Sequence, residues 1–413
     1  MSVTQTLKNN RVMGAVALIS SFSALATYIF LGLAARKLTA DDFSTLSTIW
    51  SLIFVISGVW LGAIEPELTR SRTHLDNDAH HAASRISFYG IVIVAVVLIV
   101  IQFASSGLTD HGLYTNLVLP MGTLFSATWL VHMRSDLAAT GKPLRFASIA
   151  PFDALVRLIT FLVMAAAVNM TANSALLSVF IGMTSAAILA STYARPSRTN
   201  ALSSRSSVLS STSRIFNLAL GASGLTLMLS GLPLLTRLLG RGSSYDISVV
   251  SATSTVTRAP LILVLGFESL LVAKYSLVVK NHLLTIRFVK AVVLSSAVVA
   301  FFAGGASYFI GRQLVSFLTG GRYLPNHLEI SLFAVGSTFM AFIILSTPFV
   351  IAQSRHHVIS RSWVAALVIF ISCAQFIGDA VLGVAVGYAS TGLACISLIY
   401  LDIFRSISTS ERH

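Results

Sequence analysis

Charged side chains are scarce in this sequence. Asp, Glu, Lys and Arg together make up 10% of its 413 residues, whereas a soluble domain has about 25%. Hydrophobic residues make up 55%, and long apolar runs recur from one end of the chain to the other. An apolar run of about 20 residues can satisfy its backbone inside a bilayer as a helix. The composition therefore predicts an all-α polytopic membrane protein.

Cysteine is also rare. Cys373 and Cys395 both lie within apolar runs, which is typical of small buried side chains and not of a disulfide or a metal site. The histidine pairs at 80–81 and 356–357 have no carboxylate or cysteine at the spacing that a metal requires, and adjacent side chains on a helix point in different directions. We therefore expect no metal and no other cofactor.

Long segments between the apolar runs are lacking as well. The longest, 64–85 and 195–213, are too short to build the extramembrane active site of a glycosyltransferase, polymerase or ligase. The chain has no GxxxxGK[ST] phosphate loop. Its net charge of +13 is spread between the apolar runs and forms no basic face interleaved with aromatics. We therefore expect neither an enzyme nor a partner for nucleic acid.

The apolar runs predict twelve transmembrane helices. They lie near 13–35, 43–63, 86–104, 115–133, 146–168, 174–194, 214–239, 247–272, 288–311, 328–352, 361–382 and 388–404. The first is long enough to span the membrane, so we expect it to be retained and not cleaved. With a cytoplasmic N-terminus, most of the 28 lysines and arginines fall on the cytoplasmic side, as the positive-inside rule requires. Both termini are therefore predicted in the cytoplasm, with the chain in the plasma (inner) membrane.

The sequence divides into two halves. A linker rich in Ser and Arg, 195–213, separates an N-terminal lobe, 1–194, from a C-terminal lobe, 214–413. The halves are weakly similar: LAARKLTADDFSTLS joins spans 1 and 2, and LLTRLLGRGSSYDISVVS joins spans 7 and 8. Because spans 1 and 7 both begin inside, this repeat would be parallel, about an axis along the membrane normal.

Four stretches carry a resemblance to a known family. They are GLAARKLTADDF (32–43), SGLPLLTRLLG (230–240), LVSFLTGGRY (314–323) and GYASTGLA (387–394). The first resembles the turn between helices 1 and 2 of the oligosaccharide-lipid flippases, whose superfamily also holds the lipid II flippase and the multidrug and toxin extrusion (MATE) exporters. The others are similar to the seventh helix of that family, to the turn before the tenth, and to the entry of a late helix.

This resemblance implies a transporter with a MATE-like fold, in which two six-helix lobes surround a central cavity that opens alternately to each side. It implies that the cargo is an undecaprenyl-pyrophosphate-linked oligosaccharide moving to the outer leaflet for surface polysaccharide assembly. Twelve helices favour a glycan repeat unit over a peptidoglycan precursor, since the lipid II flippases have two more. The implied partners are the lipid-linked oligosaccharide, membrane lipids and other envelope polysaccharide assembly proteins.

Two arginines lie deep within predicted spans. Arg258 is about 11 residues into span 8, or roughly 17 Å, and Arg157 is at a similar depth in span 5. A charged side chain at that depth is costly and normally faces a cavity or a partner. Because Arg binds phosphate bidentately, we hypothesise that both hold the pyrophosphate of the lipid. The alternative is structural, since Asp153 precedes Arg157 by four residues and would pair with it. Asp153 is also a candidate for coupling to a proton or Na⁺.

Basic residues near the inner helix ends are weaker candidates. Arg70, Arg72 and Lys274 would contact an anionic head group at the cytoplasmic mouth, or would be ordinary positive-inside residues. Glu65 and Glu268 occupy equivalent inner helix ends and are predicted to lie at the interface, in contact with basic loop residues.

Two further functions compete with the flippase. A small-molecule or drug exporter of the same superfamily is one alternative, although midplane arginines would repel a cationic cargo. A purely structural partner in an envelope assembly is the other, and it leaves the cost of the two arginines unexplained.

Overall fold

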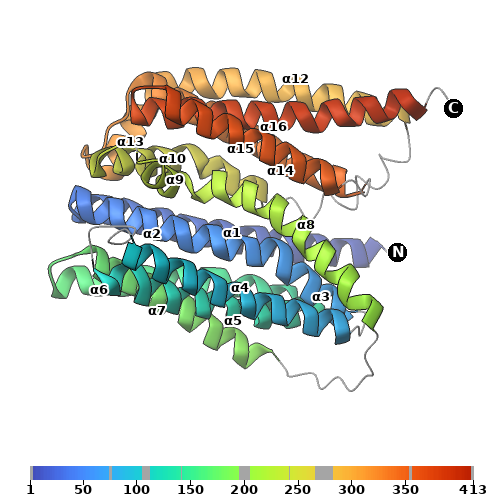
Figure 1. Ribbon diagram of the computed structural model, residues 1–413, viewed down its shortest axis with the longest axis horizontal. Coiled ribbons are helices and arrows are strands. Elements are labelled where there is room, and N and C mark those ends of the chain that lie inside the picture. The colour runs from blue at the N-terminus through green and yellow to red at the C-terminus, as the bar shows by residue number, and fades with distance from the viewer. Residues whose placement is uncertain are drawn as a thin grey trace. The chain divides into compact units, whose positions relative to one another are not determined.

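The computed structural model describes residues 3–73, 77–104, 112–140, 142–194, 205–240, 242–265, 282–352 and 356–410. Every regular element within these residues is helical (Figure 1). The chain divides into two compact units, Met1–Thr226 (unit 1) and Leu227–His413 (unit 2). The boundary lies inside one helix, α8, which begins at Arg205. Residues 195–204 of the predicted linker lie outside the described residues.

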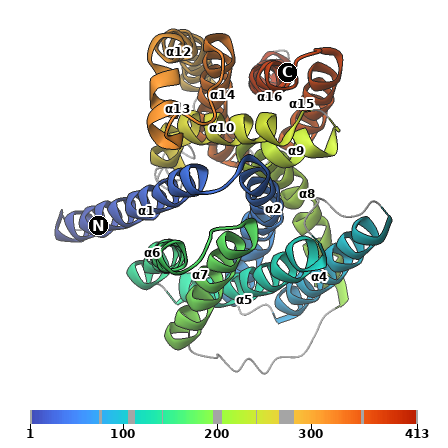
Figure 2. The ribbon, with the colours of Figure 1, turned by 90° about the vertical axis from the view of Figure 1, so that its left-hand side faces the viewer.

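The described part of unit 1 is built mainly of long helices, with two π-helical turns. Its elements are α1 (Val3–Lys37), α2 (Ala40–Val59), the π-helical turn η1 (Trp60–Ile64), α3 (Glu65–Thr73), α4 (Asn77–Ala104), η2 (Tyr114–Val118), α5 (Leu119–Ala139), α6 (Pro143–Ala167), α7 (Ala172–Tyr193) and α8 (Arg205–Ser230). Within it, α1 packs along α6, α6 along α7, and α7 along α5 (Figure 2).

Unit 2 has the same all-helical character. Its elements are α9 (Leu232–Leu238), α10 (Ser244–Leu265), α12 (His282–Ala306), η3 (Ser307–Gly311), α13 (Arg312–Thr319), α14 (His327–Ala352), α15 (His356–Phe376) and α16 (Ala380–Ser410). The packed pairs are α15 with α16, α14 with α16, α12 with α14, and α10 with α14.

The predicted spans coincide with these helices. Nine helices within the described residues are long and apolar enough to cross a membrane, and the bent pair Leu218–Ser230 and Leu232–Leu238 makes ten. The break in that pair falls at Gly231, just before Pro233, and the two segments meet at 90°. The chain is therefore a multi-pass helical membrane protein, as its composition predicts.

Of the other two predicted spans, 115–133 lies on η2 and α5, and 247–265 lies on α10. Residues 266–272 of the second lie outside the described residues. These helices are more polar because they are buried by the rest of the protein. On α10, Ser251, Thr253, Ser254 and Thr255 are all buried. The Thr255 hydroxyl donates to the carbonyl of Ser251 one turn earlier, at 2.7 Å. Hydroxyls that bond back to their own helix remove the cost of placing them in an apolar surrounding.

The predicted boundary between the last two spans is wrong. The apolar runs were divided at 382 and 388, whereas α15 ends at Phe376 and α16 begins at Ala380. Asp379 starts α16, since its carboxylate accepts a hydrogen bond from the Leu382 amide at 2.9 Å. A short polar turn inside a continuous apolar run is invisible to a hydropathy pattern. The GYASTGLA stretch therefore lies within α16 and not at its entry.

Reciprocal caps begin several helices. At the start of α2, the Thr39 hydroxyl accepts from the Asp42 amide at 3.2 Å and donates to its carboxylate at 2.7 Å. At the start of α10, the Asp246 carboxylate accepts from the amide and hydroxyl of Ser243, at 2.7 and 2.9 Å. Asp42 also accepts from the Ala172 amide at 2.8 Å, which ties α7 to α2. The LTADDF stretch thus has a structural role as a helix start.

A close helix crossing holds α8 against the α2–η1 segment. Gly58 and Gly62, four residues apart, face Thr226 and Ala222 of α8. A Cβ on Gly62 would lie 2.7 Å from the Ala222 Cβ. Small residues at this spacing let two membrane helices approach closely, so that packing and short contacts hold them together.

We therefore expect Gly62→Ala to destabilise the protein, because the added methyl forces the two helices apart at a cost of about 1–3 kcal/mol. The measurement is the midpoint of thermal unfolding of the purified protein in detergent. Gly305→Ala in α12 is the matched control, since a Cβ there has nothing within 4 Å and alanine favours a helix by about 1 kcal/mol. An equal midpoint for the two variants would contradict the close crossing.

Candidate functional site

Arg157 is buried in the middle of α6. Its side chain is 2% exposed, and its guanidinium forms an ion pair with the Asp153 carboxylate one turn earlier. The four-residue spacing places both side chains on one face of the helix. The pair neutralises two charges where either alone would be very unfavourable.

Aromatic rings from α1 and α2 surround the same guanidinium. Its central carbon lies 4.7 Å from the Trp50 ring, 5.9 Å from Phe54 and 6.0 Å from Phe30. Trp50 and Phe54 stack at 4.5 Å, and Phe161 of α6 meets Phe30 edge-on at 5.1 Å. Cation–π contacts away from water contribute about 2 kcal/mol. Three helices therefore meet around one arginine.

The pair is enclosed but incompletely hydrogen-bonded. Within the described residues, Nε and Nη1 of Arg157 and Oδ1 of Asp153 have no hydrogen-bond partner. Gly182 of α7 approaches the pair closely, since a Cβ there would lie 2.7 Å from Asp153 Oδ1. Unpaired donors and an acceptor in a buried site are costly. These atoms are therefore places where water, a proton or a ligand would lower the free energy.

Arg258, on α10, has a different environment. It is partly exposed, and its Nε donates to the Ser254 carbonyl at 2.7 Å and its Nη2 to the Ser254 hydroxyl at 2.5 Å. These bonds go to neutral acceptors of its own helix. Beside it, Ser337 of α14 donates to Thr257 at 3.3 Å and contacts the Tyr388 hydroxyl of α16 at 3.4 Å. A polar connection thus joins α10, α14 and α16 next to Arg258.

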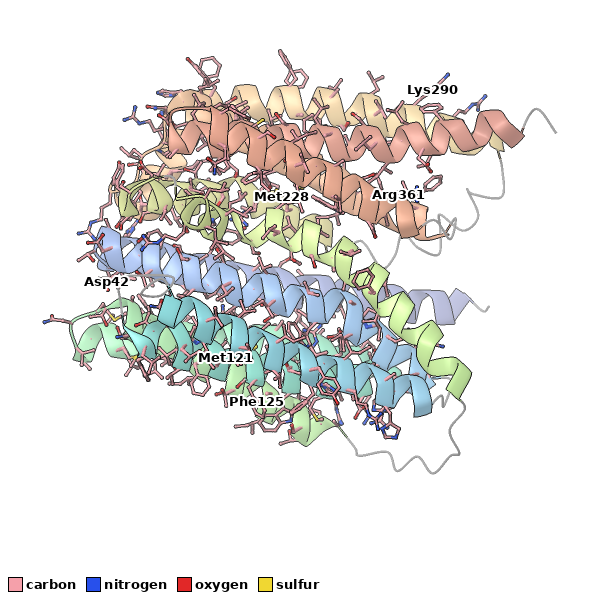
Figure 3. The ribbon with its side chains drawn as sticks, viewed as in Figure 1. Asp42, Met121, Phe125, Met228, Lys290 and Arg361 are labelled. Carbon is pink, nitrogen blue, oxygen red and sulfur yellow. The ribbon has the colours of Figure 1, made fainter. Side chains whose placement is uncertain are left out.

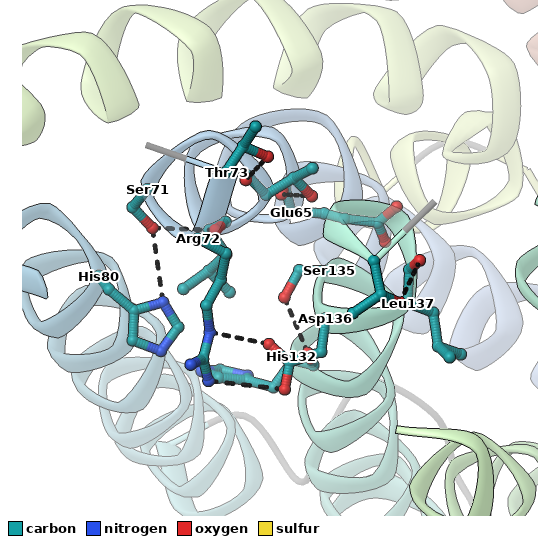
Figure 4. A network of polar contacts seen from close by, with 12 residues as sticks. Glu65, Ser71, Arg72, Thr73, His80, His132, Ser135, Asp136 and Leu137 are labelled. Carbon is teal, nitrogen blue, oxygen red and sulfur yellow. Dashed lines mark hydrogen bonds and ion pairs between the residues drawn. The ribbon is translucent and has the colours of Figure 1, made fainter. Parts of the chain in front are cut away.

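Arg70 and Arg72 lie in a cluster of ion pairs on α3 and α5. Arg72 reaches from α3 to Asp136 at 2.9 Å (Figure 4). Arg70 pairs with Glu67 at 2.7 Å, within α3. Both arginines are thus held by carboxylates of unit 1. Lys274, the third residue predicted at this mouth, lies outside the described residues.

A second ion pair joins the same two helices. Arg134 of α5 reaches Glu65 of α3 at 3.2 Å and lies 4.5 Å from the Phe146 ring. Glu65 therefore contacts a basic residue of another helix and not of a loop, and Glu268 lies outside the described residues.

Asp136, which pairs with Arg72, lies beyond the predicted end of its span. Burial raises the pKa of the Asp136 carboxyl above its usual value, and the nearby Arg72 and His132 oppose this rise. His80 of α4 joins the cluster through Ser71, whose hydroxyl contacts the His80 Nδ1 at 3.4 Å (Figure 4). The cluster thus joins α3, α4 and α5 at one end of unit 1.

The described residues form two helical units whose long apolar helices define a polytopic membrane protein. No family model matches the chain, and no curated protein matches it by sequence. A multidrug resistance MATE family transporter of the MOP superfamily, solved in an inward-facing conformation, aligns over 97% of this chain and 98% of its own, with a TM-score of 0.71 and 12% identity. The lipid II flippase MurJ, in an inward closed conformation, aligns over 94% and 87%, with a TM-score of 0.64 and 13% identity. The chain therefore has a MATE-like fold, as the resemblance in its sequence implies.

The sequence singled out the arginines but not what surrounds them. The aromatic ring cluster around Arg157 comes from three helices, and no spacing along the chain links Phe30 to Trp50 or Phe161. The helix caps of α2 and α10 were not predicted either, although each has a recognisable sequence pattern. Each reads as Ser or Thr followed three residues later by Asp, at 39–42 and at 243–246, which marks a helix start.

The Asp153–Arg157 pair is open to a double-mutant cycle. We expect Asp153→Asn or Arg157→Met alone to lower thermal stability strongly, because each leaves a buried charge without its partner, at roughly 3–5 kcal/mol. The double variant leaves no unpaired charge, so its loss is smaller than the sum of the two single losses. Unfolding midpoints of the four proteins in detergent give the coupling, and strictly additive losses would contradict a structural ion pair.

Proposed function

We propose that this protein is a transporter that flips an undecaprenyl-pyrophosphate-linked oligosaccharide repeat unit from the cytoplasmic to the outer leaflet. The fold supports transport, since it is shared with the MATE family transporter and the lipid II flippase. In this proposal the two units expose the cargo alternately to the two sides. The protein lies in the plasma membrane with both termini in the cytoplasm.

The observation that carries the choice of cargo is Arg258. Arg258 lies within a predicted span, is partly exposed, and donates to the carbonyl and the hydroxyl of Ser254. Keeping a charge in a span costs about 2.5 kcal/mol or more, and an anionic cargo offsets that cost. A pyrophosphate offers several oxygens to the planar fork of an arginine.

Arg157 takes a lesser part in this proposal. Its charge is compensated by Asp153, and its side chain is almost fully buried. It would reach a pyrophosphate only if the ion pair opened. Arg258 is therefore the first residue to test, and Arg157 the second.

Export of a small cation is the alternative, and Asp153 with the rings of Phe30, Trp50 and Phe54 favours it. A carboxylate beside aromatic faces is suited to a cation. However, the Arg157 guanidinium already occupies this position. A cationic cargo would therefore have to displace a cation that is part of the protein.

The first test of the proposal is the lipid pool of a deletion strain. We expect mass spectrometry of extracted lipids to show one complete undecaprenyl-pyrophosphate glycan accumulating, because synthesis continues on the cytoplasmic leaflet while removal stops. The glycan should be labelled in inverted vesicles and not in intact cells. An unchanged lipid pool, measured while surface polymers are being made, would refute the flippase, and retention of small compounds by the strain would favour the exporter.

The second test uses variants of Arg258 in the same strain. We expect Arg258→Gln to slow flipping at least tenfold, which corresponds to about 1.4 kcal/mol, and Arg258→Lys to restore part of the rate, since it keeps the charge but loses the bidentate fork. Arg312→Gln, at an exposed position of α13, is the matched control and should flip normally. If Arg258→Gln flips the cargo at the normal rate, with the variant present at the wild-type level, Arg258 does not bind the pyrophosphate.

A further inference from the structure

Helix α14 packs against both α10 and α16 of unit 2, with side chains between the helices (Figure 3). One serine of α14 contacts both neighbours. The Ser337 hydroxyl donates to the Thr257 hydroxyl of α10 at 3.3 Å and contacts the Tyr388 hydroxyl of α16 at 3.4 Å. Ser337 is 3% exposed and Tyr388 is 0% exposed. Hydroxyl groups buried in the protein thus link three helices.

Ser337 differs from the other hydroxyl residues near it on α14. Thr338, Ser346 and Thr347 each donate to the α14 carbonyl four residues earlier. This bond satisfies a hydroxyl within its own helix. Ser337 donates across to α10 instead, so its hydroxyl contributes to the contact between the helices.

The direction of the hydroxyl chain follows from the number of protons. A serine hydroxyl has one proton, and that of Ser337 goes to Thr257. The Tyr388 hydroxyl must therefore donate to Ser337. Thr257 in turn donates to a carbonyl of its own helix, that of Thr253 at 3.1 Å or that of Ser254 at 3.4 Å. The donations run in one direction, from α16 through α14 to the backbone of α10.

The Tyr388 ring is closely packed, so its hydroxyl has a defined place. Gly336 of α14 faces the ring, and a Cβ there would lie 2.5 Å from the Tyr388 Cδ1. Phe333 lies beside it, with the ring centroids 6.0 Å apart. A buried phenol hydroxyl is costly without a hydrogen-bond partner, and Ser337 supplies that partner.

The hydroxyl chain ends beside Arg258. The Arg258 Nε donates to the Ser254 carbonyl at 2.7 Å, and the Thr257 hydroxyl reaches the same carbonyl. Two residues further on, Pro260 lies inside α10. Because proline has no amide proton, the Val256 carbonyl cannot receive the usual bond from the residue four positions on. This part of α10 is held less by its own helix, so contacts from α14 and α16 contribute more to its position.

We propose that Tyr388 is a positioning residue for Arg258. Through Ser337 and Thr257 it holds the segment of α10 that carries the guanidinium, so that Arg258 meets the pyrophosphate in one orientation. Tyr388 is fully buried and acts through Arg258 without touching the cargo. This inference rests on the role of Arg258 in the proposed function.

A second tyrosine of α16 provides a matched control. The Tyr400 hydroxyl contacts the Ser346 hydroxyl of α14, and Tyr400 is 2% exposed. Ser346 bonds back to the Phe342 carbonyl of α14 and, within the described residues, not to α10. Tyr388→Phe and Tyr400→Phe therefore each remove one buried phenol hydroxyl from the same pair of helices, but the first also removes the donor at the start of the chain to α10.

The first test compares flipping rates in the deletion strain, with all variants at the wild-type protein level. We expect Tyr388→Phe to slow flipping about fivefold, the order expected for one lost hydrogen bond, and Tyr400→Phe to flip normally. In an Arg258→Gln background, Tyr388→Phe should not slow the residual rate further, because the group that it positions is absent. No slowing by Tyr388→Phe, equal slowing in both backgrounds, or equal slowing by Tyr400→Phe would overturn the proposal.

Hydrogen–deuterium exchange of the purified full-length protein in detergent tests the positioning without any cargo. We expect Tyr388→Phe to raise the exchange rate of the amides of residues 254–265 about threefold, since these helical bonds open more often, and Tyr400→Phe to leave it unchanged. Unchanged exchange in Tyr388→Phe would overturn the link to α10. Faster exchange together with normal flipping by Arg258→Gln would support the link and refute the pyrophosphate role, so the two failures are distinguishable. Ser337→Ala breaks the same chain and carries both tests if the unfolding midpoint shows that Tyr388→Phe does not fold.

Discussion

The structure depends on one rule: a charge or polar group within an apolar span needs a partner, because leaving it without one costs much free energy. Unit 1 satisfies this rule for Arg157 with a carboxylate on its own helix and aromatic faces from α1 and α2. In unit 2, Arg258 donates to the carbonyl and hydroxyl of the serine one turn earlier. Arg157 is buried, whereas Arg258 is partly exposed. Two arginines at similar depths in the sequence therefore have different surroundings.

The same rule explains how far the sequence could be interpreted. Apolar runs locate the helices because the bilayer demands them, and the four-residue spacing of Asp153 and Arg157 pairs them on one helix face. Contacts between helices follow no such spacing. Nothing in the sequence indicates that Trp50 lies over Arg157, or that Arg72 pairs with Asp136, 64 residues away. The turn at Asp379 was missed because its neighbours are apolar on both sides, so that hydropathy alone shows one continuous stretch.

One kind of helix start occurs in both units. Thr39 with Asp42 and Ser243 with Asp246 form the same reciprocal cap, each at the start of the second long helix of its half. In both, one short polar side chain satisfies amides that would otherwise be unpaired at a helix end. The two helix starts thus share one pattern of polar contacts.

The crossing of Gly58 and Gly62 on α8 has a consequence for the order of assembly. Unit 1 extends to Thr226, so its first six long helices leave a narrow glycine-lined face of α2 and η1 without its partner. During synthesis, that face has no packing partner until Ala222 and Thr226 have left the ribosome and entered the bilayer. Maturation of the first half thus depends on chain that follows the Ser- and Arg-rich segment, and the two halves cannot be made as separate pieces divided at that segment without leaving one helix face uncovered.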